Sequence, residues 1–407
     1  MQPSNPELQV INSLCKNKDI GTAFSRDIDE MFGPYEDVWA FLKDYYSTYN
    51  SVPDMSLVTS KFDEVEQVET HAETAYYIDA LRESFLTTRM NEVLMKYAEN
   101  VDKIGGSAAL EKMSTALTKL GKYTASLNDV DITDFDGALE EYDRIREQLQ
   151  ETGSAGIPFG FDFIDSVFPS GMTGGQLIYL FGFSGKFKSW IGLQTVINAW
   201  KKGITPLIFS LEMSPDQVRN RIYTLLGEGL FDLNEMTRGE VDRQDFENFS
   251  NSVLAGKPKF RIISNQGKSD ITPAVIQGYI DKYKPGIVLV DFQQLMSDNA
   301  KSEGMTVKMN NATNELKALA MSNNIPIVAI SAVTDNEGKN RKEVPRIEML
   351  AWSRSLEYAA EIAIAIHKHE DTDIVEAAVR KNRNGDLAVG YLKVDAARGK
   401  IEEVDGM

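Results

Sequence analysis

The first third of the chain has the hydrophobic period of α-helices. Over residues 6–120, apolar side chains recur three and four positions apart, and no alternating strand pattern interrupts them. The clearest helical segments are residues 8–14, 38–46 and 75–94. Breaks with turn-forming residues separate them, at residues 32–34, 50–54 and 105–106. The pattern predicts a small all-α domain over residues 1–125.

A polar, acidic segment follows and leads into an amphipathic helix. Thr133, with Asp136 three positions later, can cap this helix. Its apolar positions share one face and are Phe135, Leu139, Tyr142, Ile145 and Leu149. An ordinary core helix carries such a stripe too. Because the helix lies between two domains and ends in a Gly/Ser-containing segment, we favour a helix that docks on a neighbouring domain or subunit, and we assign residues 126–155 as a linker.

After Gly156 the pattern changes to short apolar runs separated by helical stretches of ten or more residues. Five runs lack polar alternation, namely residues 177–183, 206–211, 260–263, 287–291 and 326–331. Strands buried on both faces have this pattern, which is typical of a mostly parallel α/β sheet. Three later runs lie closer together, at residues 362–367, 374–379 and 388–394, and suggest hairpins that extend the sheet. We predict an α/β domain over residues 156–407.

Composition narrows the class of protein. With 407 residues and 42% hydrophobic residues, the chain can fill two or three cores, so a mainly disordered protein is excluded. No basic-then-apolar leader and no apolar stretch near 18 residues occurs, so we expect a cytoplasmic protein that does not cross a membrane. The single cysteine, Cys15, excludes a disulfide framework. His71, His367 and His369 are too few for a zinc site, so any metal should be bound by oxygen.

The net charge of −18 is unevenly distributed along the chain. Residues 1–155 carry 14 Lys and Arg against 29 Asp and Glu, a net charge of −15. The remainder carries 29 basic against 32 acidic residues, a net charge of −3. The second part of the chain can therefore still present basic loops to a polyanion such as nucleic acid.

The first apolar run leads into a candidate phosphate-binding loop. Residues 182–189 read GFSGKFKS and precede a helical stretch. A strand, a glycine loop, Lys-Ser and a helix place backbone N–H groups and a helix N-terminus around an anion. Lys188 would bind the β/γ-phosphate oxygens and Ser189 would bind Mg²⁺. The candidate nucleotide-binding residues are Gly182, Ser184, Gly185, Lys188 and Ser189.

The loop departs from G-x-x-x-x-G-K-S at one position, where Phe187 replaces the last glycine. A side chain there can crowd the phosphates or resist the backbone angles that glycine takes freely. Gly185 and Lys186, two positions earlier, could partly substitute. Alone, the motif also fits a strand-to-helix turn that binds no ligand.

Two acidic residues at the ends of later runs strengthen the nucleotide hypothesis. Glu212 follows the second run, at the strand end where open α/β sheets bind ligands, and can orient and deprotonate an attacking water. Asp291 ends the fourth run and suits a water-mediated contact to Mg²⁺. A lone acid of this kind more often forms a cap or hydrogen bond, but the order lysine, glutamate, aspartate predicts a nucleotide site.

These residues resemble the DnaB-type replicative helicases, which have a RecA-like P-loop motor domain with a mostly parallel sheet. The likeness runs over nearly the whole chain. It is carried by residues 157–161 (IPFGF) before Asp165, 174–178 (GGQLI), 210–213 (SLEM), 291–295 (DFQQL), 316–320 (LKALA), 325–328 (IPIV) and 381–385 (KNRNG).

The resemblance implies an ATP- and Mg²⁺-dependent ring hexamer around single-stranded DNA, with a helical N-terminal domain and a linker helix docked on the adjacent subunit. Lys188 and Ser189 would bind nucleotide and Mg²⁺, Glu212 would be the catalytic carboxylate, and Asp291 the metal-binding acid. Lys381 and Arg383 would reach into the neighbour's site and stabilise transition-state charge. On spacing alone, both could equally be solvated charges on a hairpin. A primase or a helicase loader is a further implied partner.

The chain departs from this family in two further places. The polar Ser-Gln pair after the fourth strand of the family reads Ser331-Ala332 here. In the DNA-contacting loop, the family's Arg-Glu pair is replaced by Ala351-Trp352. Phosphate contact is then expected from Arg354, and Trp352 can stack on a base or simply pack. Further positive charge for DNA comes from Lys339, Arg341 and Lys342.

The leading hypothesis is an ATP-dependent replicative DNA helicase. One alternative is a helicase relative that binds nucleotide weakly and serves as a replication scaffold or adaptor. The other is a RecA-like recombination ATPase, against which the helical N-terminal domain and linker helix argue.

Overall fold

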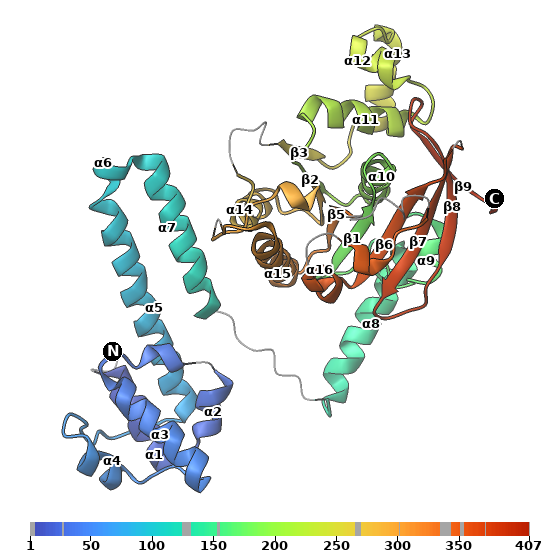
Figure 1. The fold of residues 1–407 in the computed structure, drawn as a ribbon. Helices are drawn as coiled ribbons and strands as arrows, with labels where there is room; N and C mark the ends of the chain where they lie inside the picture. Colours follow the sequence, from blue (N-terminus) through green and yellow to red (C-terminus); the bar gives the residue numbers. More distant parts are fainter. Residues whose placement is uncertain are drawn as a thin grey trace. The chain divides into compact units, whose positions relative to one another are not determined.

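The computed structural model describes residues 5–26, 28–123, 132–152, 155–264, 270–300, 302–333, 343–350, 354–370 and 372–406. The chain forms two compact units, residues 1–133 and 134–407, and each is described by itself (Figure 1). In the described part of the chain, no helix has both the length and the apolar character needed to cross a membrane.

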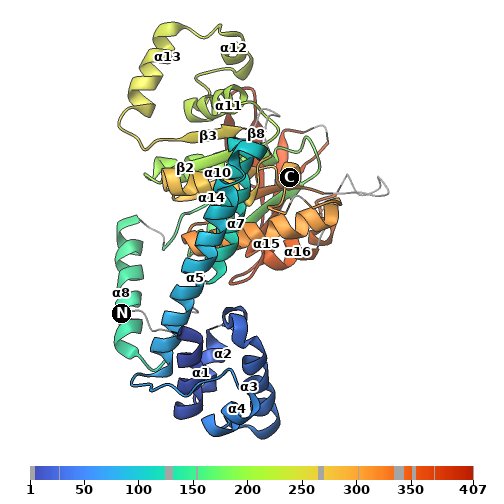
Figure 2. The same ribbon diagram turned by 90° about the vertical axis from the view of Figure 1, so that its left-hand side faces the viewer.

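The first unit is helical, as the sequence predicts. Its helices are α1 (Pro6–Asn17), α2 (Ile20–Ser25), α3 (Glu36–Tyr49), α4 (Met55–Lys61), α5 (Thr74–Ala98), α6 (Val101–Ile104) and α7 (Gly106–Leu120). Asn5 caps α1 by accepting a hydrogen bond from the backbone N–H of Leu8. Trp39 is buried and stacks on Phe32 with ring centroids 4.8 Å apart. Helices α5 and α7 lie side by side (Figure 2) and form a hairpin with α6 at its turn (Figure 1).

The second unit is built on one nine-stranded sheet. Its strands are β1 (Leu177–Gly182), β2 (Pro206–Ser210), β3 (Arg261–Ser264), β4 (Ile287–Asp291), β5 (Ile327–Ala332), β6 (Ile362–Lys368), β7 (Ile374–Asn382), β8 (Val389–Asp395) and β9 (Lys400–Val404). The spatial order is β3-β2-β4-β5-β1-β6-β7-β8-β9. Strands β1 to β6 pair in parallel, and β6 to β9 pair antiparallel. The predicted mostly parallel α/β sheet with hairpin extension is confirmed.

Helices cover both faces of this sheet (Figure 1). The helices of the unit are α8 (Phe135–Thr152), α9 (Asp162–Asp165), α10 (Lys188–Lys201), α11 (Pro215–Gly227), α12 (Leu233–Arg238), α13 (Arg243–Phe249), α14 (Pro273–Tyr283), α15 (Met305–Asn323) and α16 (Arg354–Ala359). Ile178 and Leu180 of β1 pack in the hydrophobic cluster that includes α10 and α11. Leu177 and Tyr179 pack in the second cluster, with α14 and α15. Burial of both faces explains why the central strands show no polar alternation.

Candidate nucleotide-binding site

The predicted phosphate loop joins the C-terminal end of β1 to the first turn of α10. Gly182 must be glycine, because a Cβ atom there would lie 2.3 Å from the carbonyl oxygen of Ile366 on β6. Gly185 has a φ of +73°, in the left-handed region that favours glycine. The loop therefore turns sharply and brings the N-terminus of α10 to the cavity at the C-terminal edge of the strands, as an anion site requires.

Phe187 has the left-handed backbone conformation that the last glycine of the G-x-x-x-x-G-K-S motif would take freely. Its φ is +67° and it is the residue immediately before α10. A left-handed conformation costs a non-glycine residue roughly 1–2 kcal/mol. Phe187 lines the cavity at this end of the sheet and packs against the first hydrophobic cluster, and the Nζ atom of Lys368 lies 5.3 Å from its ring centroid. The loop therefore holds Phe187 at the cost of a strained backbone angle, and the nearby Lys368 on β6 offsets part of that cost.

The two lysines of the loop have different partners. The Nζ atom of Lys188 donates a 2.7 Å hydrogen bond to the carbonyl oxygen of Phe183. Lys186 instead donates a 2.8 Å bond to the carbonyl oxygen of Lys368 on β6. Burial lowers the pKa of Lys188 to about 8, and the negative charges of Asp291 and Glu212 only partly offset this effect.

The two predicted acids lie at adjacent strand ends facing the loop. Ser210 of β2 pairs with Asp291 of β4, and Leu211 donates a 2.8 Å backbone hydrogen bond to the Asp291 carbonyl oxygen. Glu212 follows directly. Asp291 is 3% exposed. Burial raises the pKa of its carboxyl group, and a hydrogen bond with the Ser189 side chain opposes that rise.

Arg221 is a site residue that no sequence pattern indicated in advance. It lies on α11, whose start is fixed by a capping box at Ser214 and Gln217. The guanidinium carbon of Arg221 lies 5.2 Å from the centroid of the Trp190 ring, on α10. Burial lowers the pKa of Arg221, and the charges of Asp291 and Glu212 raise it. The sequence feature that could have pointed to Arg221 is its place on the first helix after the β2 strand, nine residues beyond Glu212.

A buried amide links the ends of β4 and β5. The Nε2 atom of Gln294, which is 8% exposed, donates hydrogen bonds to Ser331 Oγ at 2.7 Å and to the Ala332 carbonyl oxygen at 3.2 Å. Position 332 lacks the amide side chain that the family resemblance led us to expect there. In this fold an amide from the neighbouring strand end contacts that position.

These groups enclose a cavity of about 390 Å³ at the C-terminal edge of the parallel strands. Its lining includes Ser184, Gly185, Phe187, Lys188, Ser189, Glu212, Arg221, Asp291 and Ala332. The Ser189 hydroxyl and the Asp291 carboxylate are oxygen donors, which suit Mg²⁺. Within the described ranges, no group of three His, Cys, Asp or Glu residues is placed to hold a metal. Four of the predicted nucleotide residues, Ser184, Gly185, Lys188 and Ser189, and both acids thus line one cavity, whereas Gly182 is not part of its lining.

Lys381 and Arg383 lie at the opposite end of the same sheet. Lys381 of β7 pairs with Ala363 of β6, and β6 pairs at this end with the start of β1. The phosphate loop leaves the other end of β1. Lys381 is in the row of Tyr179, three residues before Gly182, which is about 10 Å along the strand, and Arg383 is level with the start of β1, about 17 Å from Gly182 at ~3.3 Å per residue. Neither cation lines the cavity that contains the phosphate loop of its own chain.

The candidate DNA-binding residues are only partly covered by the structure. Lys339, Arg341, Lys342 and Trp352 lie outside the described residues. Arg354 is the first residue of α16, and its side chain also lies outside the described part.

A glycine-containing loop between a strand and a helix, with two acids at adjacent strand ends of a mostly parallel sheet, is the arrangement of a RecA-like P-loop fold. Residues 156–403 match the DnaB-like helicase C-terminal domain family, and the chain belongs to this family.

Relatives extend the likeness beyond that domain. A probable replicative DNA helicase of Trieres chinensis is 26% identical over 343 residues, covering 78% of this chain and 71% of the relative. The replicative DNA helicase DnaB of Leifsonia xyli is 23% identical over 335 residues, with the same coverage of 78% and 71%. A solved DnaB-like replicative helicase, described together with its interactions with primase, matches 99% of this chain and all of that chain, with a TM-score of 0.69 and 17% identity.

The motor fold is matched separately. A solved ATPase domain matches with a TM-score of 0.59 and 19% identity, covering 68% of this chain and 100% of that domain. The predicted fold class and family are confirmed.

Proposed function

We propose that this protein is an ATP-dependent replicative DNA helicase that works as a ring hexamer on single-stranded DNA. The observation that carries the proposal is the separation of two sets of groups on one sheet. The nucleotide groups lie at the C-terminal edge, whereas Lys381 and Arg383 lie at the other end of β1 and β6. In this proposal the two cations act on the nucleotide of an adjacent copy of the chain.

Within the cavity, each residue has a distinct role in hydrolysis. Lys188 would leave the Phe183 carbonyl oxygen and bind the β/γ-phosphate oxygens. Glu212 would accept a proton from the attacking water as the oxygen bonds to the γ-phosphorus and the bond to the leaving ADP oxygen breaks. Arg221 adds a positive charge beside the two acids. Ser189 and Asp291 would hold Mg²⁺, which when bound neutralises charge on the phosphates.

The linker helix supports self-assembly. In α8, the side chains of Phe135, Leu139, Tyr142, Ile145 and Leu149 are all exposed. An apolar stripe left exposed on a single chain favours coverage by another surface. We propose that α8 docks on the adjacent subunit, so that the ring is held by one helix per interface.

Partners and location follow from the same proposal. Single-stranded DNA would bind in the ring through Arg354, Trp352, Lys339 and Arg341. Primase is a candidate partner because the solved helicase that matches the chain is described with its primase interactions, and a helicase loader is another. A protein of this function would work in the cytoplasm.

A replication scaffold that hydrolyses ATP poorly is the second candidate function. Phe187 favours it, because a residue with a large side chain and a strained backbone angle lines the cavity where the phosphates would bind. The two candidates share the fold and the ring and differ in turnover.

The deciding experiment is an ATPase assay with and without single-stranded DNA, combined with unwinding of a forked duplex. The helicase proposal expects DNA-stimulated hydrolysis and unwinding, both abolished in Lys188→Ala and Glu212→Gln. Arg398→Ala, on the exposed turn between β8 and β9, is the matched control and should behave as wild type. Nucleotide binding without hydrolysis, with or without DNA, would favour the scaffold.

A further inference from the structure

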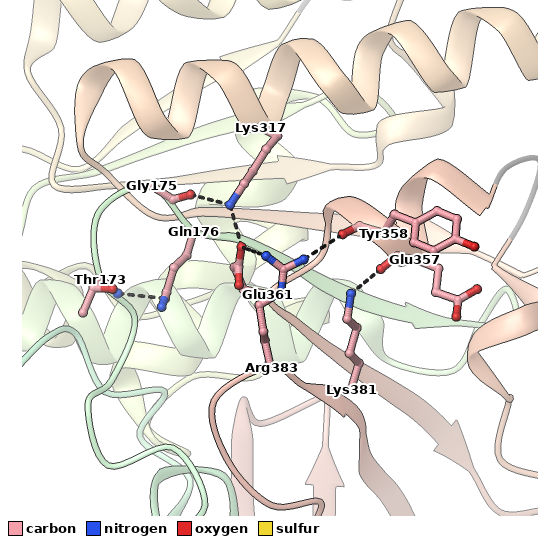
Figure 3. Close-up of polar contacts among 9 residues, drawn as sticks. All are labelled: Thr173, Gly175, Gln176, Lys317, Glu357, Tyr358, Glu361, Lys381 and Arg383. Atoms are coloured by element: carbon pink, nitrogen blue, oxygen red, sulfur yellow. Dashed lines mark hydrogen bonds and ion pairs between the residues drawn. The ribbon is translucent and has the colours of Figure 1, made fainter. Parts of the chain in front are cut away.

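One carboxylate joins two cations from distant parts of the second unit. The Oε1 atom of Glu361 accepts hydrogen bonds from Lys317 Nζ at 2.7 Å and from Arg383 NH1 at 3.2 Å (Figure 3). Glu361 lies between α16 and β6, Lys317 lies on α15, and Arg383 directly follows β7. The backbone N–H of Arg383 also donates to the Glu361 carbonyl oxygen at 3.0 Å. Side chain and backbone of Arg383 are therefore both fixed to Glu361.

In this contact the Glu361 carboxylate is largely buried, but the Arg383 side chain is exposed. The Glu361 side chain is 12% exposed, whereas that of Arg383 is 53% exposed. Lys317 also donates a 2.9 Å bond to the carbonyl oxygen of Gly175, just before β1. Glu361 is thus held from inside the domain, and Arg383 extends from it toward solvent. A partner outside the chain can still reach the guanidinium group.

The end of α16 holds the same region from a second direction. Arg383 NH2 donates a 3.2 Å bond to the Tyr358 carbonyl oxygen, and Lys381 Nζ donates a 2.5 Å bond to the Glu357 carbonyl oxygen. These carbonyls lie in the last turn of the helix, where the dipole attracts cations. Lys317, Lys381 and Arg383 carry three positive charges against the two negative charges of Glu361 and Glu357, so the cluster keeps a net charge of about +1. The cluster keeps positive charge to offer to an anion.

We propose that Glu361, held by Lys317, is a positioning residue that sets the direction and reach of Arg383 toward the nucleotide of the adjacent copy. The inference rests on the proposed function and deepens it. A free arginine side chain samples many rotamers, and a pre-formed contact with Glu361 reduces that freedom before the transition state forms. Misplacement of a catalytic group by about 1 Å can cost roughly 100-fold in rate.

A purely structural ion pair is the competing explanation, since Lys317 and Glu361 also tie α15 to the starts of β1 and β6. The two explanations differ in which active site is damaged. A positioning role lowers turnover at the neighbour's site and spares the chain's own cavity. A structural role disturbs β1 and the phosphate loop that leaves it, so the damage falls on the chain's own site.

The test is subunit mixing with Glu361→Gln. Alone, this variant should lower kcat by roughly 10- to 100-fold with little change in nucleotide KM, and Glu361→Asp, which keeps the charge, should recover part of the loss. Mixed with Glu212→Gln subunits, it should regain activity above either variant alone, because its intact cavity then meets an intact neighbour's arginine. No recovery on mixing would overturn the proposal in favour of a structural role.

A double-mutant cycle gives an independent readout. If Glu361 acts through Arg383, then adding Glu361→Gln to Arg383→Ala should lower kcat no further. Additive losses would overturn the proposal. Glu247→Gln, which breaks a 2.9 Å pair with Arg243 on α13, is the control for loss of a carboxylate and should leave kcat unchanged.

The same data separate this inference from the proposed function. Wild-type kcat in Arg383→Ala would refute the trans role of the arginine itself, and with it the inference. A strong loss in Arg383→Ala beside a wild-type kcat in Glu361→Gln would leave the proposed function standing and overturn only the positioning role.

Discussion

The ammonium group of Lys188 lies 2.7 Å from the carbonyl oxygen of Phe183, inside the loop that a phosphate would enter. A buried ammonium group whose hydrogen-bond acceptor is a neutral carbonyl oxygen can exchange that acceptor for a phosphate oxygen. Lys186 instead reaches β6 and holds the loop to the sheet. The two lysines are therefore expected to have different functions.

Lys188→Ala should abolish nucleotide binding, whereas Lys186→Ala should keep most of it. Both lysines line the cavity, but the charges of Asp291 and Glu212 act on Lys188, whereas the ammonium group of Lys186 is bound to the Lys368 carbonyl oxygen on β6. Titration of each variant with a fluorescent ATP analogue measures the effect, and circular dichroism checks that both fold. The reverse ranking would mean that the loop binds phosphate in a different register.

Phe187→Gly should raise the affinity for ATP. The substitution removes the ring from the cavity and gives the left-handed backbone angle to the residue that takes it without strain. Phe187→Ala is the matched control, since it removes the ring but keeps a Cβ atom at that angle. Equal gains in both variants would assign the effect to the ring alone. Unchanged or lower affinity in Phe187→Gly would show that the loop has adapted to phenylalanine.

Nucleotide affinity should fall as the pH rises above about 8. The pKa of Lys188 is lowered to about 8 by burial, so above that pH the free protein holds this lysine mostly uncharged. A bound phosphate favours the ammonium form, so binding then requires proton uptake. The dissociation constant should be nearly flat below about pH 8 and rise about tenfold per pH unit above it.

Lys188→Arg is the control for this pH dependence, because arginine stays protonated throughout the range. Its dissociation constant should stay flat between about pH 8 and 9.5, and calorimetry in buffers of different ionisation enthalpy should detect proton uptake only in the wild type. The same slope in Lys188→Arg would assign the dependence to another group.

The parts of the fold that the sequence predicted are those buried on two faces. The apolar run that forms β1 contains only buried residues, so its uninterrupted apolar sequence was enough to predict a buried strand. Asp291 stood out for the same reason, as an acid at the end of such a run. β9 was not predicted because it is a largely exposed edge strand. Its sequence, with Lys400, Glu402 and Glu403, is as polar as that of a surface loop.

The missed parts of the site depend on contacts between distant residues. Glu361 binds Lys317 and Arg383 across 44 and 22 positions, and no local pattern indicates those pairs. Arg221 reads as an ordinary charge on a helix until α11 is packed against α10. Such contacts are set by tertiary packing, which periodicity and spacing do not encode.

Binding of single-stranded DNA should be strong at low salt and strongly salt-dependent. Residues 156–407 lie in the part of the chain with a net charge near zero, since most of the −18 falls before residue 156. A basic inner surface is therefore compatible with an acidic protein. Each phosphate neutralised on a single strand contributes a slope of about −0.7 to log K against log salt.

Arg354→Ala should weaken this binding and flatten the slope by about 0.7, the contribution of one phosphate. Trp352→Ala should cost about 1–3 kcal/mol only if the ring stacks on a base, and should leave the slope unchanged because it removes no charge. Fluorescence anisotropy with labelled oligonucleotides at several salt concentrations measures both effects, with Arg398→Ala as the control arginine. A protein that forms rings with nucleotide but has no measurable affinity for single-stranded DNA at low salt would refute the helicase proposal and favour the scaffold. A protein that does not bind single-stranded DNA cannot translocate along it.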